Sequence, residues 1–129
     1  MEKHQNMANN KKVLIVDDDN RNIFALTAVL KAKGYQCVSA PLAEEGLQLL
    51  KGDPDIAVVL MDMMMPGMDG YEAIARMKEI PELKDIPVIA VTAQAMVGDR
   101  ERCLNAGAKG YVSKPINVDT LLQLISQYF

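Results

Sequence analysis

Residues 56–70 read IAVVLMDMMMPGMDG, an apolar run that ends in an aspartate and continues into a turn-forming segment. A short, continuous run of Ile, Val and Leu is typical of a strand that is covered on both faces, as in a parallel sheet. Comparable apolar runs recur along the chain. The sequence therefore predicts five strands, over residues 13–16, 36–39, 56–61, 88–91 and 111–113.

Helical patterns fill the intervals between these strands. Apolar residues recur at helical spacing in the first and last intervals, at Ile23, Leu26 and Leu30 and at Val118, Leu121, Leu122 and Ile125. Residues that favour turns or helix ends follow the predicted helices, at Gly34, Gly52, Pro54, Pro81, Pro87 and Gly107. The fourth helix, expected over residues 95–106, has the fewest apolar anchors (Met96, Cys103 and Leu104), so we expect it to be the most mobile.

Five alternating strand and helix units predict an α/β fold with a five-stranded parallel sheet and helices on both faces. For five strands this favours the flavodoxin-like (βα)5 order 2-1-3-4-5, in which strands one and three are neighbours. We expect residues 11–129 to form this one domain and residues 1–10, which are polar and aperiodic, to be a disordered leader. His4, the single histidine, lies in that leader and is expected to be inert.

The composition excludes several classes of protein. A formal net charge of -3 over 129 residues argues against a nucleic-acid-binding domain, which usually carries a strongly basic face. No apolar run approaches the roughly 20 residues that a membrane-spanning helix needs. Cys37 and Cys103 have neither the spacing nor the density of a disulfide scaffold, so we expect buried or half-buried free thiols and a cytoplasmic location.

Polar residues follow the predicted strands at the sheet edge where ligands bind. Strand one runs into Asp17, Asp18 and Asp19, strand three ends at Asp62, strand four ends at Thr92, and Lys114 follows strand five. Three neighbouring carboxylates repel one another by about 4 kcal/mol per pair at an effective dielectric constant near 20, so the group favours a cation. Oxygen ligands without His or Cys indicate a hard ion, Mg²⁺ before Mn²⁺ or Ca²⁺.

Some of these residues have a simpler structural interpretation. Asp19 or Asn20 is expected to cap the first helix, and Asp69 the third, which leaves Asp17 and Asp18 without a structural role. Considered by itself, Thr92 is consistent with an ordinary β-branched strand residue. Tyr111, considered by itself, is consistent with a core residue. Five methionines cluster at positions 61, 63, 64, 65 and 68, where packing is a better interpretation than a Cu(I) site because no Cys or His joins them.

Four segments, VLIVDDD (13–19), LMDMMMPGMDG (60–70), VTAQAM (91–96) and GYVSKP (110–115), together resemble the signature segments of response-regulator receiver domains. The resemblance covers residues 11–129 and is as close to receivers of hybrid histidine kinases as to free-standing ones. It implies that Asp62 is the phosphoacceptor, that Asp18 binds Mg²⁺ directly and that Asp17 acts largely through metal-bound water. The backbone carbonyl of Met64 would be the third protein ligand, and Mn²⁺ would substitute for Mg²⁺.

The resemblance also implies roles for the remaining site residues. Lys114 would pair with a phosphoryl oxygen, and the Lys114–Pro115 peptide bond would be cis. Thr92 would donate a hydrogen bond to the phosphoryl group, and Tyr111 would change rotamer when that group is bound. The bulky Met64 side chain would border the route of hydrolytic water and slow dephosphorylation. The surface of the fourth helix, fifth strand and fifth helix would change shape on phosphorylation.

The implied partners are proteins. A histidine kinase or histidine phosphotransfer protein would donate the phosphoryl group, since the chain has no Gly-rich nucleotide-binding loop, and a downstream protein or domain would read the changed surface. The domain would be a monomer or a weak phosphorylation-dependent dimer, with no nucleic-acid or membrane contact. It would catalyse its own phosphorylation and dephosphorylation but would not be an enzyme with a separate substrate.

Two alternatives differ in class. Asp17-x-Asp19 after a strand is similar to the nucleophile motif of haloacid-dehalogenase-like phosphatases, although Arg21 stands where that motif has Thr or Val and the chain is too short for a cap domain. A pseudo-receiver that only binds partners is disfavoured because the full set of site residues is present.

Overall fold

A five-stranded parallel sheet runs through the centre of the computed structural model, which describes residues 10–93 and 97–129. Its strands are β1 (Lys12–Val16), β2 (Gln36–Ala40), β3 (Ile56–Asp62), β4 (Val88–Thr92) and β5 (Gly110–Ser113). They lie in the order β2-β1-β3-β4-β5. The predicted fold class and strand order are therefore confirmed, and each predicted strand end lies within one residue of the observed end.

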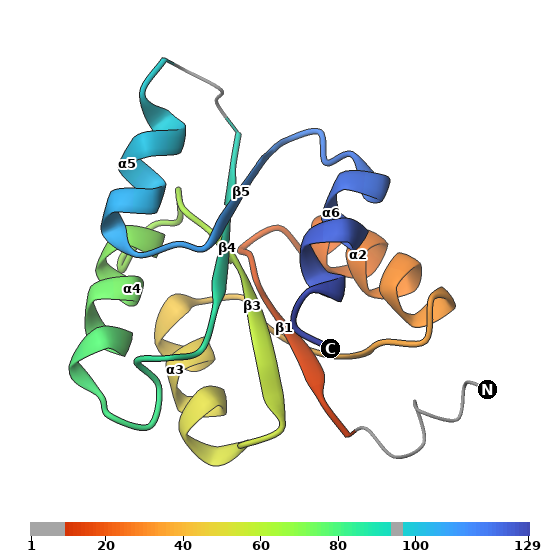
Figure 1. Cartoon of the computed structure of the whole chain (residues 1–129), viewed down its shortest axis with the longest axis horizontal. Coiled ribbons are helices and arrows are strands. Elements are labelled where there is room, and N and C mark those ends of the chain that lie inside the picture. Colours follow the sequence, from red (N-terminus) through yellow and green to blue (C-terminus); the bar gives the residue numbers. More distant parts are fainter. Residues whose placement is uncertain (1–9, 94–96) are drawn as a thin grey trace.

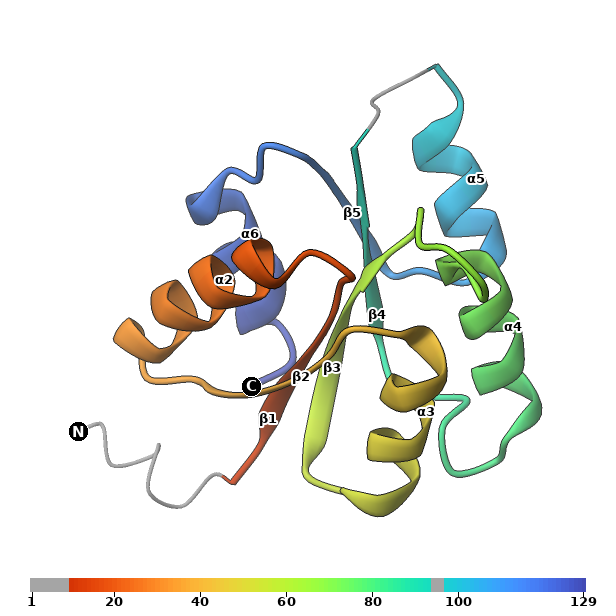
Figure 2. The same ribbon diagram turned by 180° about the vertical axis from the view of Figure 1, so that it is seen from behind.

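Five helices cover the two faces of this sheet (Figures 1 and 2). They are α2 (Asn20–Ala32), α3 (Ala43–Gly52), α4 (Gly70–Glu79), α5 (Asp99–Ala106) and α6 (Val118–Ser126). Helices α2 and α6 lie on one face, and α3, α4 and α5 lie on the other (Figure 1). Two apolar clusters result, one on each side of the sheet.

Burial on both faces explains why the inner strands are continuously apolar. Along β1, Leu14 and Val16 pack into the cluster under α3 and α4, while Val13 and Ile15 pack into the cluster under α2 and α6. All four side chains are almost fully buried. A polar residue at any of these positions would lose its hydration without gaining a partner, which is why polar residues occur only at the two ends of the strand, at Lys12 and after Val16.

The helix ends largely follow the predicted residues. Asp19 caps α2 by accepting a hydrogen bond from the Arg21 N–H at 2.9 Å, and Asp69 caps α4 by accepting one from the Glu72 N–H at 2.9 Å. Gly52 is the last residue of α3 rather than the residue after it. These side-chain acceptors satisfy backbone donors that the first helical turn leaves without a partner.

Helix α5 differs from the prediction, because it begins at Asp99 and not at residue 95. Gly98 has a φ of 91°, a left-handed conformation that cannot continue into an α-helix, so the helix starts after it. Residues 95 and 96 lie outside the described part of the chain. The helix ends as predicted at Gly107, whose φ of 120° also favours glycine.

The sulfur-containing residues pack largely as predicted. Met61, Met63 and Met65 are buried, whereas the Met64 side chain is 61% exposed. Cys103 is buried and Cys37 is half-buried, and both are free thiols, as expected. The predicted leader falls mainly on residues 1–9, and His4 with it, so both lie outside the described residues. Among the residues that are described, no helix is long and apolar enough to span a membrane.

Candidate functional site

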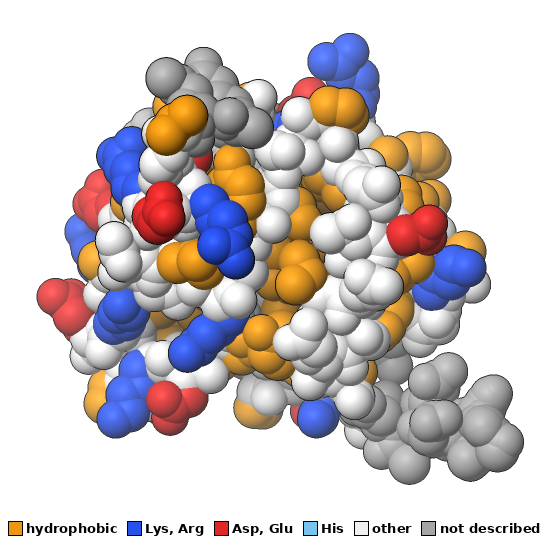
Figure 3. All heavy atoms as spheres, turned by 45° about the horizontal axis from the view of Figure 1, so that its top comes forward, with side chains coloured by type: hydrophobic (Ala, Val, Ile, Leu, Met, Phe, Trp, Pro, Cys, Tyr) orange, Lys and Arg blue, Asp and Glu red, His pale blue; other side chains and the backbone are white. Residues whose placement is uncertain are grey.

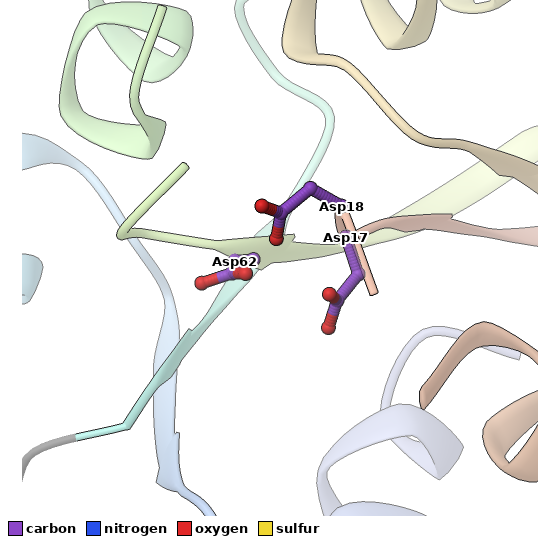
Figure 4. Close-up of side chains that lie close together, drawn as sticks. All are labelled: Asp17, Asp18 and Asp62. Atoms are coloured by element: carbon purple, nitrogen blue, oxygen red, sulfur yellow. The ribbon is translucent and has the colours of Figure 1, made fainter. Parts of the chain in front are cut away.

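Three carboxylates meet at the carboxyl ends of β1 and β3. The two strands are neighbours, with Val16 in register with Met61. The next residues, Asp17 after Val16 and Asp62 after Met61, therefore lie side by side. One ligand oxygen from each of Asp17, Asp18 and Asp62 lies within 4.8 Å of the other two. Figure 4 shows their side chains gathered around the same point. The structure thus brings together the three acids that the sequence placed at this edge.

Asp17 is the most enclosed of the three, with an exposed fraction of 3%. Its Oδ1 accepts a hydrogen bond from the backbone N–H of Asp19 at 2.8 Å, and its Oδ2 accepts one from the side-chain amide of Asn22 at 3.4 Å. The expectation that Asp17 has no structural role is therefore wrong. Its carboxylate also orders the turn that leads from β1 into α2.

Asp18 and Asp62 lie in contrasting surroundings. The Asp18 side chain is exposed, and no hydrogen bond or ion pair is found for it within residues 10–93 and 97–129. Asp62 is only 4% exposed, and its Oδ1 accepts a hydrogen bond from the Met64 N–H at 3.1 Å. Burial raises the pKa of Asp62 and the charges of Asp17 and Asp18 add to this, whereas the Met64 N–H and Lys114 oppose it. The site therefore holds a buried carboxylate whose charge is incompletely compensated.

Lys114 brings one positive charge to this group. Its Nζ lies 3.4 Å from Asp17 Oδ2 and 3.6 Å from Asp62 Oδ2. The Lys114–Pro115 peptide bond is cis, as predicted, and the Lys114 N–H donates to the carbonyl oxygen of Thr92 at 2.7 Å. One ammonium beside three carboxylates leaves an excess of negative charge, and the donors are all oxygen atoms. This donor set fits a hard divalent cation.

Thr92 and Tyr111 lie on the strands beyond β3. Thr92 is buried at the end of β4, the strand that pairs with β3, and is therefore close to the Asp62 end of the sheet. Tyr111 lies on β5 in register with Ala90 and packs partly buried against the cluster that includes Cys103. Figure 3, in which the top of Figure 1 is turned forward, shows hydrophobic side chains along the middle of the molecule, between α5 and α6. Met64 follows Asp62 by two residues, as the sequence requires.

Two sets of contacts, one in the site and one between α4 and α5, were not anticipated from the sequence. Asn22 hydrogen-bonds Asp17, although it carries no charge and lies inside a predicted helix. The Tyr71 hydroxyl on α4 lies 3.5 Å from the Cys103 sulfur on α5, and the Arg102 guanidinium stacks 4.2 Å above the centre of the Tyr71 ring. The residues in these contacts are far apart in the sequence or belong to no recognisable motif. No sequence pattern therefore predicted the contacts.

Comparisons with known proteins agree with this geometry. The model of the response regulator receiver domain family matches residues 13–126. The polar-differentiation response regulator DivK of Brucella ovis is 39% identical over 119 residues, which cover 92% of this chain and 95% of DivK. A response regulator receiver protein from Pseudomonas putida superposes with a TM-score of 0.84 at 26% identity, covering 91% of this chain and 96% of that one.

A second similar structure is the receiver domain of a sensor histidine kinase from Pseudomonas aeruginosa. It has a TM-score of 0.82 and 29% identity, and the match covers 92% of this chain and 96% of that domain. That protein holds a magnesium ion coordinated in its active-site cleft. The similarity extends over the described sheet and helices and is not restricted to one motif.

Proposed function

Because the chain belongs to the family of response regulator receiver domains, the phosphoacceptor modules of two-component signalling, we propose that Asp62 is the residue that accepts its phosphoryl group. One observation carries this assignment: Asp17, Asp18 and Asp62 offer oxygen atoms within 4.8 Å of one another, with Lys114 Nζ 3.6 Å from Asp62. Asp62 is the acid of the three that ends β3 and lies beside β4, in register with Val91. It is therefore the acid whose phosphoryl group both Thr92 and Lys114 can contact.

The same oxygen atoms fit Mg²⁺, with Mn²⁺ as a substitute. Asp18 and Asp62 would bind the ion directly, the Met64 backbone carbonyl would be the third protein ligand, and Asp17 would act through bound water. When bound, the ion supplies positive charge that a phosphoryl oxygen and the carboxylates can share. The exposure of Asp18 and the enclosure of Asp17 support this division of roles. The magnesium ion in the active-site cleft of the similar Pseudomonas aeruginosa domain supports the choice of ion.

In the proposed reaction, the Asp62 carboxylate attacks the phosphorus atom of a phosphohistidine. The new bond joins Asp62 Oδ to phosphorus while the phosphorus–nitrogen bond breaks and the electron pair leaves with the imidazole, which takes up a proton. Lys114 stabilises the negative charge that gathers on the phosphoryl oxygens, and Thr92 donates a hydrogen bond to one of them. Positioning and charge therefore provide most of the rate enhancement.

The phosphorylated state would alter the surface formed by α5, β5 and α6. The phosphoryl group would carry about 1.5 to 2 negative charges in place of the single charge of the Asp62 carboxylate, and its three acceptor oxygens would draw Thr92 and Lys114 inward and let Tyr111 change its rotamer. A hollow on this surface is lined by Tyr111, Val112, Ser113, Pro115, Asn117 and Thr120. A downstream protein or domain would bind there, and a histidine kinase or phosphotransfer protein would supply the phosphoryl group.

We further propose a cytoplasmic domain over residues 11–129, monomeric or weakly dimeric when phosphorylated, with residues 1–10 as a leader. It would catalyse its own phosphorylation and dephosphorylation without turning over a separate substrate. Receiver domains interact with histidine kinases and downstream effectors, and two of the similar structures are receiver domains of histidine kinases. No nucleic-acid contact is expected, consistent with the net charge of -3.

Intact-mass analysis after incubation with acetyl phosphate and Mg²⁺ tests the assignment. Wild type and the charge-matched control Asp85→Asn, which changes an exposed acid, should gain one phosphoryl group, and Asp62→Asn should gain none. Chelation of the metal with EDTA should abolish the gain. A phosphoryl group that still appears on Asp62→Asn would refute the assignment, and turnover of a phosphate ester by that variant would instead favour a phosphatase.

A further inference from the structure

The amide side chain of Asn22 lies against Asp17, and we propose that Asn22 is a positioning residue that fixes Asp17 in the geometry needed for Mg²⁺ binding. The proposal rests on the proposed function, since it concerns the same metal site. Asn22 itself would touch neither the metal nor the phosphoryl group. It would act through the Asp17 carboxylate.

Both oxygen atoms of Asp17 have donors, and they come from different parts of the structure. Oδ1 accepts from the Asp19 N–H at 2.8 Å, which is a local contact within the turn after β1. Oδ2 accepts from Asn22 Nδ2 at 3.4 Å and lies 3.4 Å from Lys114 Nζ. The orientation of Oδ2 therefore depends on two side chains, one neutral and one charged.

Lys114 is not a dedicated partner of Asp17, because its ammonium also lies 3.6 Å from Asp62 Oδ2. When Lys114 turns toward a phosphoryl group on Asp62, its contact with Asp17 weakens. Asn22 would then be the side-chain donor that stays on Oδ2. A carboxylate that is 3% exposed loses most of its contact with water, so a lasting donor keeps it in place.

The position of Asn22 in α2 supports a role outside the helix itself. It is the third residue of α2, whose N-terminus is already capped by Asp19, so the helix does not need a second polar side chain there. Asn is also a poorer helix former than Ala or Leu. Half-buried on the turn that faces β1, its amide is directed at Asp17 rather than at the backbone of its own helix.

A Mg²⁺ titration followed by backbone amide chemical shifts tests the proposal without depending on phosphorylation. Asn22→Ala should raise the Mg²⁺ concentration at half-saturation about fivefold, less than the roughly 10- to 100-fold typical for partners of direct metal ligands, because Asp17 would act through bound water. Asn20→Ala, which removes the same amide from an exposed position two residues earlier, should leave it unchanged. Phosphorylation by acetyl phosphate at saturating Mg²⁺ should fall less than twofold in Asn22→Ala.

A double-mutant cycle separates positioning from a general effect on the fold. In an Asp17→Asn background, Asn22→Ala should no longer change the half-saturating Mg²⁺ concentration, because the group through which it acts is altered. A fivefold effect that persists in that background would overturn the proposal, and so would an unchanged midpoint in Asn22→Ala alone. Thermal unfolding without metal checks that each variant is folded.

The outcomes also separate this proposal from the proposed function. A wild-type protein that binds Mg²⁺ but is not phosphorylated on Asp62 would refute the phosphoacceptor assignment and leave the role of Asn22 standing. A wild-type protein that is phosphorylated on Asp62, with an Asn22→Ala variant that binds Mg²⁺ equally well, would refute the role of Asn22 alone.

Discussion

Replacing Asp62 with Asn should stabilise the metal-free protein, although the residue lies at the centre of the site. The substitution keeps the shape of the side chain and retains an oxygen that can accept the Met64 N–H. It removes a buried negative charge that faces two other carboxylates. Burial already raises the pKa of Asp62, which indicates that ionising this group is unfavourable in the folded state.

The distances in the site give the size of the effect. At 4.8 Å, the upper limit of the separation between the ligand oxygens, and an effective dielectric constant of about 20, Asp62 is repelled by Asp17 and by Asp18 with about 3.5 kcal/mol each. Its attraction to Lys114 at 3.6 Å is about 4.6 kcal/mol on the same scale. The net gain on removing the charge is about 2 kcal/mol, which corresponds to an increase in melting temperature of roughly 6 to 10 °C for a domain of this size.

Thermal unfolding at low ionic strength in EDTA, followed by circular dichroism, measures this gain. The control is Asp85→Asn, which removes one charge from an exposed position and should shift the unfolding free energy by less than about 0.5 kcal/mol. Mg²⁺ at ten times its dissociation constant should then stabilise wild type by about 1.4 kcal/mol and Asp62→Asn by less. Mg²⁺ should therefore reduce the difference in unfolding free energy between wild type and Asp62→Asn.

The pH dependence follows from the raised pKa of Asp62. Above that pKa the wild-type carboxyl is charged, and Asp62→Asn should show its full gain in stability over wild type. The advantage should shrink as the pH falls through it, because the protonated carboxyl no longer repels its neighbours. An Asp62→Asn variant that is no more stable than wild type in EDTA, or an equal stabilisation of both by Mg²⁺, would refute the electrostatic reasoning.

Three further substitutions or reactions test other parts of the structure. Gly70→Ala should destabilise the protein by about 2 kcal/mol in a denaturant titration, since the new Cβ would lie 2.8 Å from Met63 Cα and 3.0 Å from the Asp62 carbonyl oxygen. Gly52→Ala, with open space around it, should have no such cost. Burial raises the pKa of Cys37 to about 11 from the usual 9.0, so in a Cys103→Ala variant near pH 8 it should react with a thiol reagent about a hundredfold more slowly than in the unfolded chain. Met64→Asn should shorten the lifetime of the phosphorylated protein a few-fold, measured by the decay of the intact-mass signal, and an unchanged lifetime would contradict the role of its side chain.

Most of the fold could be predicted because it depends on periodicity and on strand ends. The sheet buries Val13 to Val16 on both faces, so β1 had to be continuously apolar, and the change to Asp17 marked the edge of the sheet. Since the carboxyl ends of parallel strands share one edge, the meeting of Asp17 with Asp62 followed from the strand order. The caps at Asp19 and Asp69 followed from local hydrogen-bonding chemistry.

The remaining features depend on geometry that no local pattern encodes. The start of α5 was predicted four residues too early because the sequence does not show that Gly98 adopts a left-handed conformation. The structural role of Asp17 and its contact with Asn22 arise from the particular path of the turn after β1. The Tyr71 contacts with Arg102 and Cys103 depend on how α4 packs against α5.

Anomalous diffraction from crystals soaked in Mn²⁺ tests most directly whether these three acids share one divalent ion. The expected result is a single strong peak in contact with carboxylate oxygens of Asp18 and Asp62 and with the Met64 carbonyl oxygen, with Asp17 linked to it through water. Diffraction that shows no peak among residues 17, 18 and 62, or a peak bound only elsewhere, would contradict the proposed metal-assisted site.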